Sequence, residues 1–479
     1  MQSNNPTPQD LLAAAGLHDL VLLPDSDAYQ DRQASYWAAN APMRPACIVQ
    51  PCTTDEVSRI VKVLAKANYP VALRSGGHTQ WAGSNDVKNG VTIDLGRMTV
   101  VTYDGNSKLA SIQPGVRWIG VYEELLKHQV CVTGGREGNV GVGGFLTGGG
   151  ISWYAALEGL GCDNVANFEV VLATGEVVNA NASSHPDLWI ALKGGSGNFC
   201  IVTRFDMFTF PAHDLLYGVR VVDRTHGDEC AQFAVAFTDE NYRHPHTAFL
   251  LNYGFNSAMA PEPLVTNVVV DTRGISHSSA FEGILGIEAV LVDVKKKSMA
   301  DIAAANNSPH HKHQVWFTLT LKNDVRTIKH ASKMHDGLVE ELKSRMPHTE
   351  FSTQCIFQPW PSLYAEHSVQ HVGNVLGLDQ TKGNALLWLA VGSTETAEQH
   401  AIMREKLTVF SATLEDFAKS NNLNVGWRYL NYADETQNPL ASYGTSKVDF
   451  MRKVAAEYDP EGVFQRKVVS GWKICNIDA

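Results

Sequence analysis

The sequence has 479 residues, of which 44% are hydrophobic and 19% charged, a balance that is typical of a globular enzyme and excludes a disordered chain. Its 39 basic and 50 acidic residues give a formal net charge of −11, which argues against nucleic acid or an anionic membrane as a partner. No apolar run is long enough to span a membrane, and the polar residues 1–8 lack the basic region of a secretory signal. We therefore expect a cytoplasmic protein.

Short strands and helices are predicted to alternate in the first part of the chain. Strands are expected at 46–50, 71–74, 91–95, 110–113 and 168–173, and helices at 53–68, 118–125 and 187–192. Thr53 and Glu56 have the spacing of a capping box, which marks the start of the first helix. This pattern is typical of an α/β unit.

The character of the sequence changes near Pro211. Long strands are expected at 248–253, 265–271, 315–321, 351–357 and 386–391, with long helices at roughly 326–345 and 396–420. Runs of strands with a few long helices indicate an antiparallel sheet covered on one face. The last fifty residues return to short elements, with a helix around 446–457. Two domains, with the tail returning to the first, are the economical interpretation.

Glycine clusters occur at 75–77, 134–150 and 194–197. Glycines at strand ends expose backbone N–H groups, and such nests bind phosphate oxygens. None of the clusters fits GxGxxG or GxxxxGK[ST], so neither a Rossmann fingerprint nor a P-loop is present. Glycines also serve simply to turn the chain, but three clusters in one domain favour a ligand with an extended pyrophosphate, such as a dinucleotide.

Metal and hydrolase sites are not expected. His310, His311 and His313 lie in a polar stretch with no accompanying cysteine or carboxylate set, so we reject a zinc site. No GxSxG or SxxK motif supports a serine hydrolase.

Several motifs together resemble a known family. Arg74-Ser75-Gly76-Gly77-His78 closes a predicted strand, and the glycine-rich segment 141–150 follows about sixty residues later. Near the C-terminus, residues 429–432 read Tyr-Leu-Asn-Tyr and residues 458–464 read Tyr-Asp-Pro-Glu-Gly-Val-Phe. The sequence resembles the FAD-linked oxidases of the vanillyl-alcohol oxidase and berberine-bridge-enzyme superfamily, which have a p-cresol-methylhydroxylase-type flavin domain.

The resemblance implies an α+β fold with a two-part FAD-binding domain and a substrate domain built on a large antiparallel sheet covered by helices. We expect the FAD-binding domain at 1–211, with its core at 40–210, and the substrate domain at 212–427. Residues 428–479 are expected to return to the FAD-binding domain.

The resemblance also implies that FAD is bound covalently, through a bond between His78 and the 8α-methyl carbon of the flavin. The residues that match the family's flavin-binding segments are Arg74, Ser75, Gly76, Gly77, His78, Thr79, Gly138, Gly141, Val142, Gly143, Gly144, Gly148, Gly149, Asn198, Ile201, Val202, Asn431 and Tyr432.

One position departs from the family pattern. Members with a second covalent link carry a cysteine, bonded to C6 of the flavin, four residues before the glycine that matches Gly141. Here that position is Glu137, and the nearest cysteine is Cys131. A single link, with no cysteinyl bond, is therefore expected. Sequence leaves open whether Glu137 is a spectator or a carboxylate lining the pocket.

Three residues are candidates for catalysis: Tyr429, Glu366 and Glu137. Tyr429 and Tyr432 are expected to alternate with Asn431 on a strand near the flavin, with Tyr429 serving as an orienter or as the substrate base. Glu366 follows the Pro359-Trp360-Pro361 segment of the middle domain and is expected to face substrate, although a solvated loop is the plainer interpretation.

The expected function is oxidation of a small organic substrate, such as an alcohol, an amine or a biosynthetic intermediate of specialised metabolism. A base would remove a proton, the adjacent C–H would deliver hydride to flavin N5, and molecular oxygen would be the acceptor. Two alternatives stay open. One is a redox-neutral cyclase, isomerase or dehydratase on the same scaffold, in which Glu137 would suit proton transfer, and the other is a flavin-carrying binding protein.

Overall fold

The first part of the chain forms two small sheets. The computed structural model describes residues 6–478, in which the first sheet has the strand order β1-β2-β4-β3. Its strands are β1 (Val21–Leu22), β2 (Cys47–Val49), β3 (Val71–Arg74) and β4 (Val91–Asp94). Strand β4 pairs in parallel with β2 and with β3. The parallel β2 and β3 flank the predicted helix, so this unit is a crossover of the α/β type.

The second small sheet has five strands in the order β5-β6-β10-β8-β9. They are β5 (Val101–Asp104), β6 (Leu109–Ile112), β8 (Val165–Val171), β9 (Val177–Asn181) and β10 (Ile201–Phe208), and all of their pairings are antiparallel. Strands β7 (Val130–Cys131) and β11 (Phe210–Pro211) form a separate pair.

The helices of the first part agree with the sequence pattern. Helix α3 (Thr54–Leu64) begins at Thr53, whose side chain accepts from Glu56 N while the Glu56 side chain accepts from Thr53 N, so the predicted capping box is confirmed. Helices α4 (Trp118–Leu126) and α7 (Pro186–Leu192) also form where expected. The other α-helices, apart from three long ones described below, are α1 (Pro8–Ala14), α2 (Asp27–Ala34), α5 (Val142–Thr147), α6 (Ala155–Glu158), α9 (Glu282–Leu285), α10 (Met299–Ala305), α12 (Leu363–Gln370) and α14 (Thr445–Tyr458).

A seven-stranded sheet dominates the middle of the chain, and all of its pairings are antiparallel. Its order is β15-β12-β14-β13-β17-β18-β16. The strands are β12 (Leu215–Val222), β13 (Thr247–Asn256), β14 (Leu264–Asp271), β15 (Leu291–Lys297), β16 (His313–Lys322), β17 (Phe351–Trp360) and β18 (Ala385–Thr394). The predicted α+β class, with a large antiparallel sheet, is confirmed.

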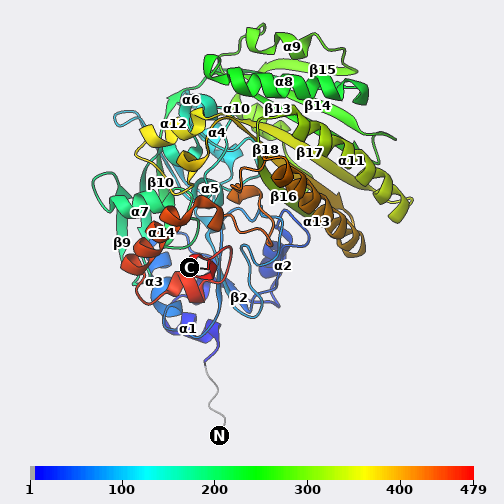
Figure 1. Cartoon of the computed structure of the whole chain (residues 1–479). Coiled ribbons are helices and arrows are strands. Elements are labelled where there is room, and N and C mark those ends of the chain that lie inside the picture. The colour runs from blue at the N-terminus through cyan, green and yellow to red at the C-terminus, as the bar shows by residue number, and fades with distance from the viewer. Residues whose placement is uncertain (1–5, 479) are drawn as a thin grey trace.

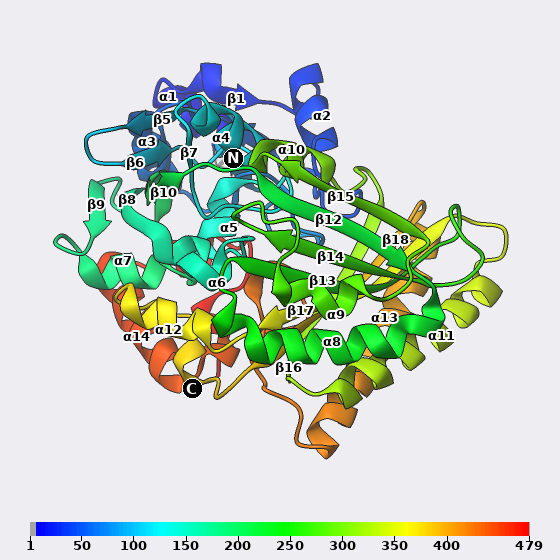
Figure 2. The same cartoon turned by 90° about the horizontal axis from the view of Figure 1, so that it is seen from above.

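Three long helices cover one face of this sheet: α8 (Gly227–Glu240), α11 (Val325–Arg345) and α13 (Ala397–Ser420). Figures 1 and 2 show them along the side of the sheet that faces away from the N-terminal elements. Side chains alternate between the faces of a strand. On β13 and β17, Leu251, Tyr253 and Cys355 therefore pack in the core under the helices, and their neighbours face the other way.

The tail of the chain packs on the first domain. Phe464 and Val468 join the core cluster formed by the first small sheet, and Val469 N donates to Val71 O at 2.9 Å. Among residues 6–478, no helix combines the length and the apolar character that crossing a membrane requires. The domain boundaries near 211 and 427 stay a proposal that these contacts support.

A buried histidine makes the stability of the helix-covered core depend on pH. His335 of α11 is fully buried, with Nε2 2.9 Å from Thr353 Oγ1. Burial, helped by the positive charge of Arg224, lowers the pKa of His335 to about 3. The unfolded chain, with a histidine pKa of about 6.5, binds this proton between these values while the folded chain does not. Stability should therefore fall as pH drops below about 6.5.

We expect His335→Gln to remove this part of the pH dependence. The free energy of unfolding of the native sequence should lose about 1 kcal/mol more per pH unit between roughly pH 6 and 4 than that of the variant. Denaturant titrations at several pH values measure the slope, and His128→Gln, at an exposed position, is the control. Equal slopes for His335→Gln and the native sequence would contradict the prediction.

Candidate active site

One cavity of about 600 Å³ separates the glycine-rich loops from the uncovered face of the large sheet. Its loop side is lined by Arg74, Ser75, Gly76, Gly77, His78, Thr79, Glu137, Gly141, Gly143, Gly144, Ser196, Gly197, Ile201 and Val202. Its sheet side is lined by Tyr217, Leu250, Asn252, Thr266, Val268, Gln314, Trp316, Ser352, Gln354, Ile356, Gln358, Leu389, Val391 and Ser393. The cavity thus joins all three predicted glycine clusters to the sheet of the middle region.

The loop after β3 presents a row of free backbone donors. The N–H groups of residues 76–79 donate to no other group within the described part of the chain. Gly77 has φ of +66°, in the left-handed region that favours glycine. Beneath it lies the buried guanidinium of Arg74, which donates to Arg32 O and Ser35 Oγ. Arg74 therefore holds the loop from behind, and the free N–H groups are suited to an anion.

Two glycine loops touch at their backbones. A Cβ atom built on Gly76 would lie 2.5 Å from Gly141 Cα, and one built on Gly141 would lie 2.5 Å from Gly76 Cα. Only glycine permits this approach, which brings the loop after β3 against the start of α5. At Gly144, by contrast, the same test finds no atom within 4 Å, so the backbone there opens onto the cavity.

We expect Gly76→Ala to lose most of the protein's bound flavin, because a methyl group must push the two loops apart. Overpacking of this kind costs about 1–3 kcal/mol, and the loops it separates line the cavity. The ratio of flavin to protein absorbance measures the loss. Gly105→Ala is the control, because its Cβ would meet only Tyr103, at 3.8 Å. A Gly76→Ala protein with full flavin content would contradict the prediction.

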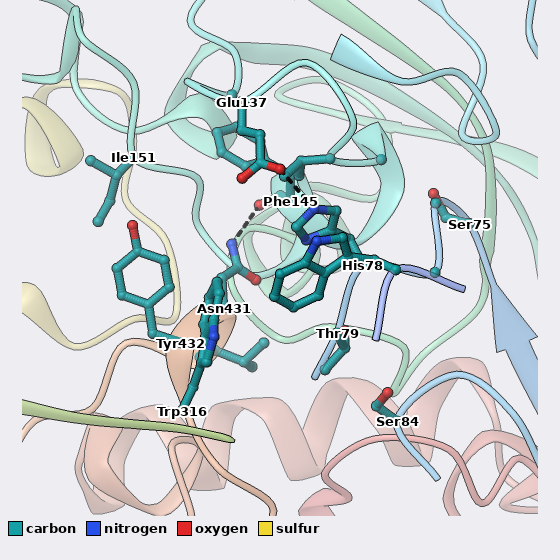
Figure 3. A pocket seen from close by; sticks show the side chains of 18 of the residues that line it. Ser75, His78, Thr79, Ser84, Glu137, Phe145, Ile151, Trp316, Asn431 and Tyr432 are labelled. Atoms are coloured by element: carbon teal, nitrogen blue, oxygen red, sulfur yellow. Dashed lines mark hydrogen bonds and ion pairs between the residues drawn. The ribbon is translucent and has the colours of Figure 1, made fainter. Parts of the chain in front are cut away.

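His78 is held by an aromatic ring and a carboxylate. Its imidazole stacks on Trp37, with ring centroids 4.4 Å apart and planes at 10°. Its Nε2 lies 3.1 Å from Glu137 Oε1 (Figure 3). Nδ1 bonds to no other group of residues 6–478, so the ring is oriented with one nitrogen engaged and one free.

Glu137 is fixed by a second partner as well. Ser308 donates to its carboxylate from the backbone N, at 2.9 Å, and from Oγ, at 3.0 Å. Burial opposes ionisation of Glu137, but the hydrogen bonds from His78 and Ser308 outweigh it and hold the pKa of the carboxyl below its usual value. Glu137 is therefore an ionised carboxylate lining the cavity beside the imidazole.

Tyr429 and its neighbours differ from the expectation. Residues 430–432 form a 3₁₀ turn (Leu430–Tyr432) rather than the predicted strand. The Tyr429 hydroxyl accepts hydrogen bonds from Gly150 N at 3.1 Å, Ile151 N at 3.0 Å and Asn431 Nδ2 at 3.0 Å. Burial raises the pKa of this phenol above its usual value. Tyr429 thus lines the cavity and braces the segment after α5, and its hydroxyl already accepts three hydrogen bonds, which favours the orienting role over that of a base.

Tyr432 is half-buried and lines the cavity. Its hydroxyl accepts from Arg136 Nη2 at 2.6 Å, and that same nitrogen donates to Gln358 Oε1 at 2.7 Å. In Figure 3, Asn431 lies between Tyr432 and the pair of His78 and Glu137, and it donates to Phe145 O at 3.1 Å. Because the phenol accepts from a cation, its own proton is free to contact a molecule in the cavity.

The structure places Glu366 outside the cavity and so gives no support to this catalytic candidate. Its side chain is exposed on α12, where Ser362 Oγ donates to it at 3.3 Å, and it does not line the cavity.

Five of the predicted flavin-binding residues lie behind the residues that line the cavity, namely Gly138, Val142, Gly148, Gly149 and Asn198. Asn198 is buried and donates to Gly195 O and Trp472 O, so it ties the third glycine cluster to the tail.

Other lining residues carried no recognisable signal in the sequence. Trp37, Ser308, Trp316 and Arg136 come from four separate segments that converge only in the folded chain. Of these four residues, Arg136 could have been suspected from the sequence, because it is adjacent to Glu137.

The residues present fit FAD. Consecutive free N–H groups at 76–79 suit a pyrophosphate, the glycine at 144 opens the wall, and an oriented imidazole lies beside them. A family model described as an FAD binding domain matches residues 45–181.

Known proteins share this sequence and this fold. The FAD-dependent monooxygenase sdcF of Emericella nidulans is 36% identical over 457 residues, which cover 95% of each chain. The 6-hydroxy-D-nicotine oxidase of Arthrobacter nicotinovorans has a TM-score of 0.77 at 21% identity, covering 93% of this chain and 96% of its own. The glucooligosaccharide oxidase of Acremonium strictum, whose FAD is described as 6-S-cysteinyl and 8α-N1-histidyl, has a TM-score of 0.77 at 20% identity, covering 97% and 99%. Together with the fold and the cavity, these likenesses show that the chain is an FAD-dependent oxidoreductase and belongs to the vanillyl-alcohol oxidase and berberine-bridge-enzyme superfamily.

Proposed function

We propose that this protein is an FAD-dependent oxidase of secondary metabolism that holds its cofactor covalently through His78 and transfers hydride from a small organic substrate, with molecular oxygen as the final acceptor. The observation that carries the proposal is the single cavity joining the His78 loop to the open face of the large sheet. When bound, the flavin supplies the two-electron acceptor. The residues described here bind it, orient the substrate and move protons.

The surroundings of His78 support one covalent link. The Trp37 stack and the Glu137 contact fix the imidazole and leave Nδ1 free to form a bond. Glu137 stands where relatives with two links have a cysteine, and a carboxylate cannot form a thioether. Cys131 is buried away from the cavity, with its Sγ 3.6 Å from Val132 O. Both features support a histidyl link without a cysteinyl one.

Tyr432 is the group we assign to the substrate proton. Its hydroxyl lines the cavity and is held by the Arg136 cation at 2.6 Å. Arg136 also fixes the position of the phenol, so that its oxygen can contact a substrate O–H or N–H that must lose a proton. General base catalysis of this kind contributes about 10²–10⁴-fold to rate.

The test is anaerobic mixing of the purified yellow protein with a panel of alcohols, amines and polyketide-like phenols. An oxidase substrate should bleach the flavin absorbance, and readmitted oxygen should restore it with release of hydrogen peroxide. The redox-neutral alternative stays open, because Glu137 is an ionised carboxylate in the same cavity and could transfer a proton. Product formed while the flavin absorbance stays constant would support that alternative and overturn the oxidase.

A relative's name suggests a third outcome. The 36% identical protein is called a monooxygenase, and a monooxygenase incorporates one oxygen atom into product. Reaction under ¹⁸O₂ followed by mass spectrometry distinguishes the two: an oxidase leaves product unlabelled, and a labelled product would contradict the proposal.

A further inference from the structure

An uncompensated cation lies on the sheet side of the cavity. Arg136 is half-buried and forms no ion pair with any Asp or Glu among residues 6–478. Its hydrogen bonds go to the neutral acceptors Gln358 Oε1 and Tyr432 Oη, both from Nη2. A charge that is partly removed from water and has no counter-ion is costly, so an anionic partner from outside the chain would stabilise it.

Part of the Arg136 guanidinium is unused. Within the described chain, Nε and Nη1 donate to no acceptor, and neither is a buried atom closed off from solvent. The face of the group packs over the Trp153 ring, 4.9 Å from its centroid. The ring and the two Nη2 bonds fix the plane of the guanidinium. Nε and Nη1 each keep an N–H group that can donate to an anionic oxygen, one at a time and not as a fork.

The other charged groups of the cavity are already committed. Arg74 donates to Arg32 O and Ser35 Oγ and lies over the Tyr36 ring. Glu137, which is the sole carboxylate among the described lining residues, is bound to His78 and Ser308. Arg136 is therefore the free charge of the sheet side.

Apolar and aromatic residues form one patch of the sheet side, beside the polar Gln354 and Gln358 of β17. Ile356, Leu389 and Val391 form a small cluster on the uncovered sheet face, with Leu250, Trp316 and Tyr432 packed against it. All six residues line the cavity. A ligand that meets both features has a flat apolar body and an acidic end.

We propose that the substrate of this cavity is an acidic, planar molecule that places an anionic oxygen, of a carboxylate or of a deprotonated 1,3-dicarbonyl, on a free N–H group of the Arg136 guanidinium while its apolar body lies on the patch of Ile356, Leu389 and Val391. This inference rests on the proposed function, because it takes the sheet side of the cavity as the substrate site. It makes Arg136 a substrate-binding residue as well as the partner of Tyr432.

The test measures binding to the oxidised holoenzyme, without turnover. Benzoate, the enolate of 1,3-cyclohexanedione and the neutral isostere benzamide are titrated separately at pH 7, and the perturbed flavin absorption spectrum gives each Kd. We expect at least one of the two anions to bind about tenfold tighter than benzamide or more. Preference for benzoate alone points to a carboxylate, and preference for the dione alone points to an enolate. Equal binding of all three probes would overturn the proposal.

Two variants assign the preference to Arg136. Arg136→Met should abolish the preference for the anion and leave benzamide binding unchanged within about twofold. Arg97→Met is the matched control, because it removes one positive charge at an exposed position outside the cavity. An anion preference that survives in Arg136→Met would overturn the assignment. Arg136→Lys, which keeps the charge without the planar guanidinium, should retain a reduced preference and serves if the methionine variant does not fold.

The binding measurement and the oxidase test can fail independently of each other. Binding is read on oxidised flavin, so a protein that reduces no flavin still shows whether Arg136 selects anions. Conversely, an oxidase that binds benzamide as well as benzoate would keep the proposed function and lose this inference.

Discussion

Tyr432→Phe is expected to lower the rate of flavin reduction by about 100-fold or more, about 2.7 kcal/mol in the barrier, while FAD content and the covalent link stay intact. Tyr432 lines the cavity, and its hydroxyl accepts a hydrogen bond from the Arg136 cation, with Nη2 at 2.6 Å. Phenylalanine keeps the ring and its edge contact with Trp316, so the variant removes only the hydroxyl, together with the hydrogen bond that it accepts from Arg136. Anaerobic stopped-flow measurement of flavin absorbance with a reducing substrate gives the rate.

Tyr429→Phe is the matched control for this prediction. Its hydroxyl accepts from Gly150 N and Ile151 N, and its loss leaves two buried donors without a partner, which costs about 1–3 kcal/mol of stability. We expect a lower melting temperature and a flavin reduction rate within about threefold of the native one. If Tyr429→Phe instead lost the rate and Tyr432→Phe kept it, the acid–base assignment would return to Tyr429.

The regular part of the fold could be predicted because local signals agreed with tertiary packing. Strands β13 and β17 alternate between the core under the helices and the cavity, and helix α3 carries its own capping box. These patterns follow from strand and helix geometry alone.

Elements with mixed local signals were missed. Strand β12 contains Gly218 and Arg220, and β15 ends in three consecutive lysines. Glycine and charged residues have low strand propensity, but an edge position such as that of β15 tolerates and even favours lysine. Helix α8 begins at Gly227 with no side-chain cap. In each of these elements, contacts with the neighbouring strands and helices decide the structure, and not the local preference of the residues.

The candidate site was predictable where one segment carries it and unpredictable where segments converge. The loop of residues 75–78 sits where the sequence pattern placed it, at the end of β3. The predicted strand at 429–432 was wrong because tyrosine's strand preference depends on a partner strand, and here Tyr432 N donates back to Tyr429 O instead. The Trp37 stack and the Ser308 bonds to Glu137 join residues far apart in sequence, which no spacing rule reveals.

His78→Ala is expected to abolish covalent attachment of the flavin. The proposal gives the bond to the imidazole, since the ring is stacked on Trp37 and bound at Nε2 by Glu137, with Nδ1 free. Alanine has no nucleophilic atom, so acid precipitation should leave a yellow pellet from the native protein and a colourless pellet from the variant. His128→Ala, at an exposed position, should leave the pellet yellow.

The variant should still bind FAD without the covalent bond, because the donors at 76–79 are backbone groups that the substitution does not remove. The folded His78→Ala protein is therefore expected to be yellow, and it should release its flavin on denaturation. Peptide mapping of the native protein should place flavin on the peptide that contains His78. Flavin found on a peptide containing Cys131, or a His78→Ala pellet that stays yellow, would show that another residue makes a covalent bond to the flavin. Either result would also contradict the interpretation that Glu137 replaces the cysteine of a second link.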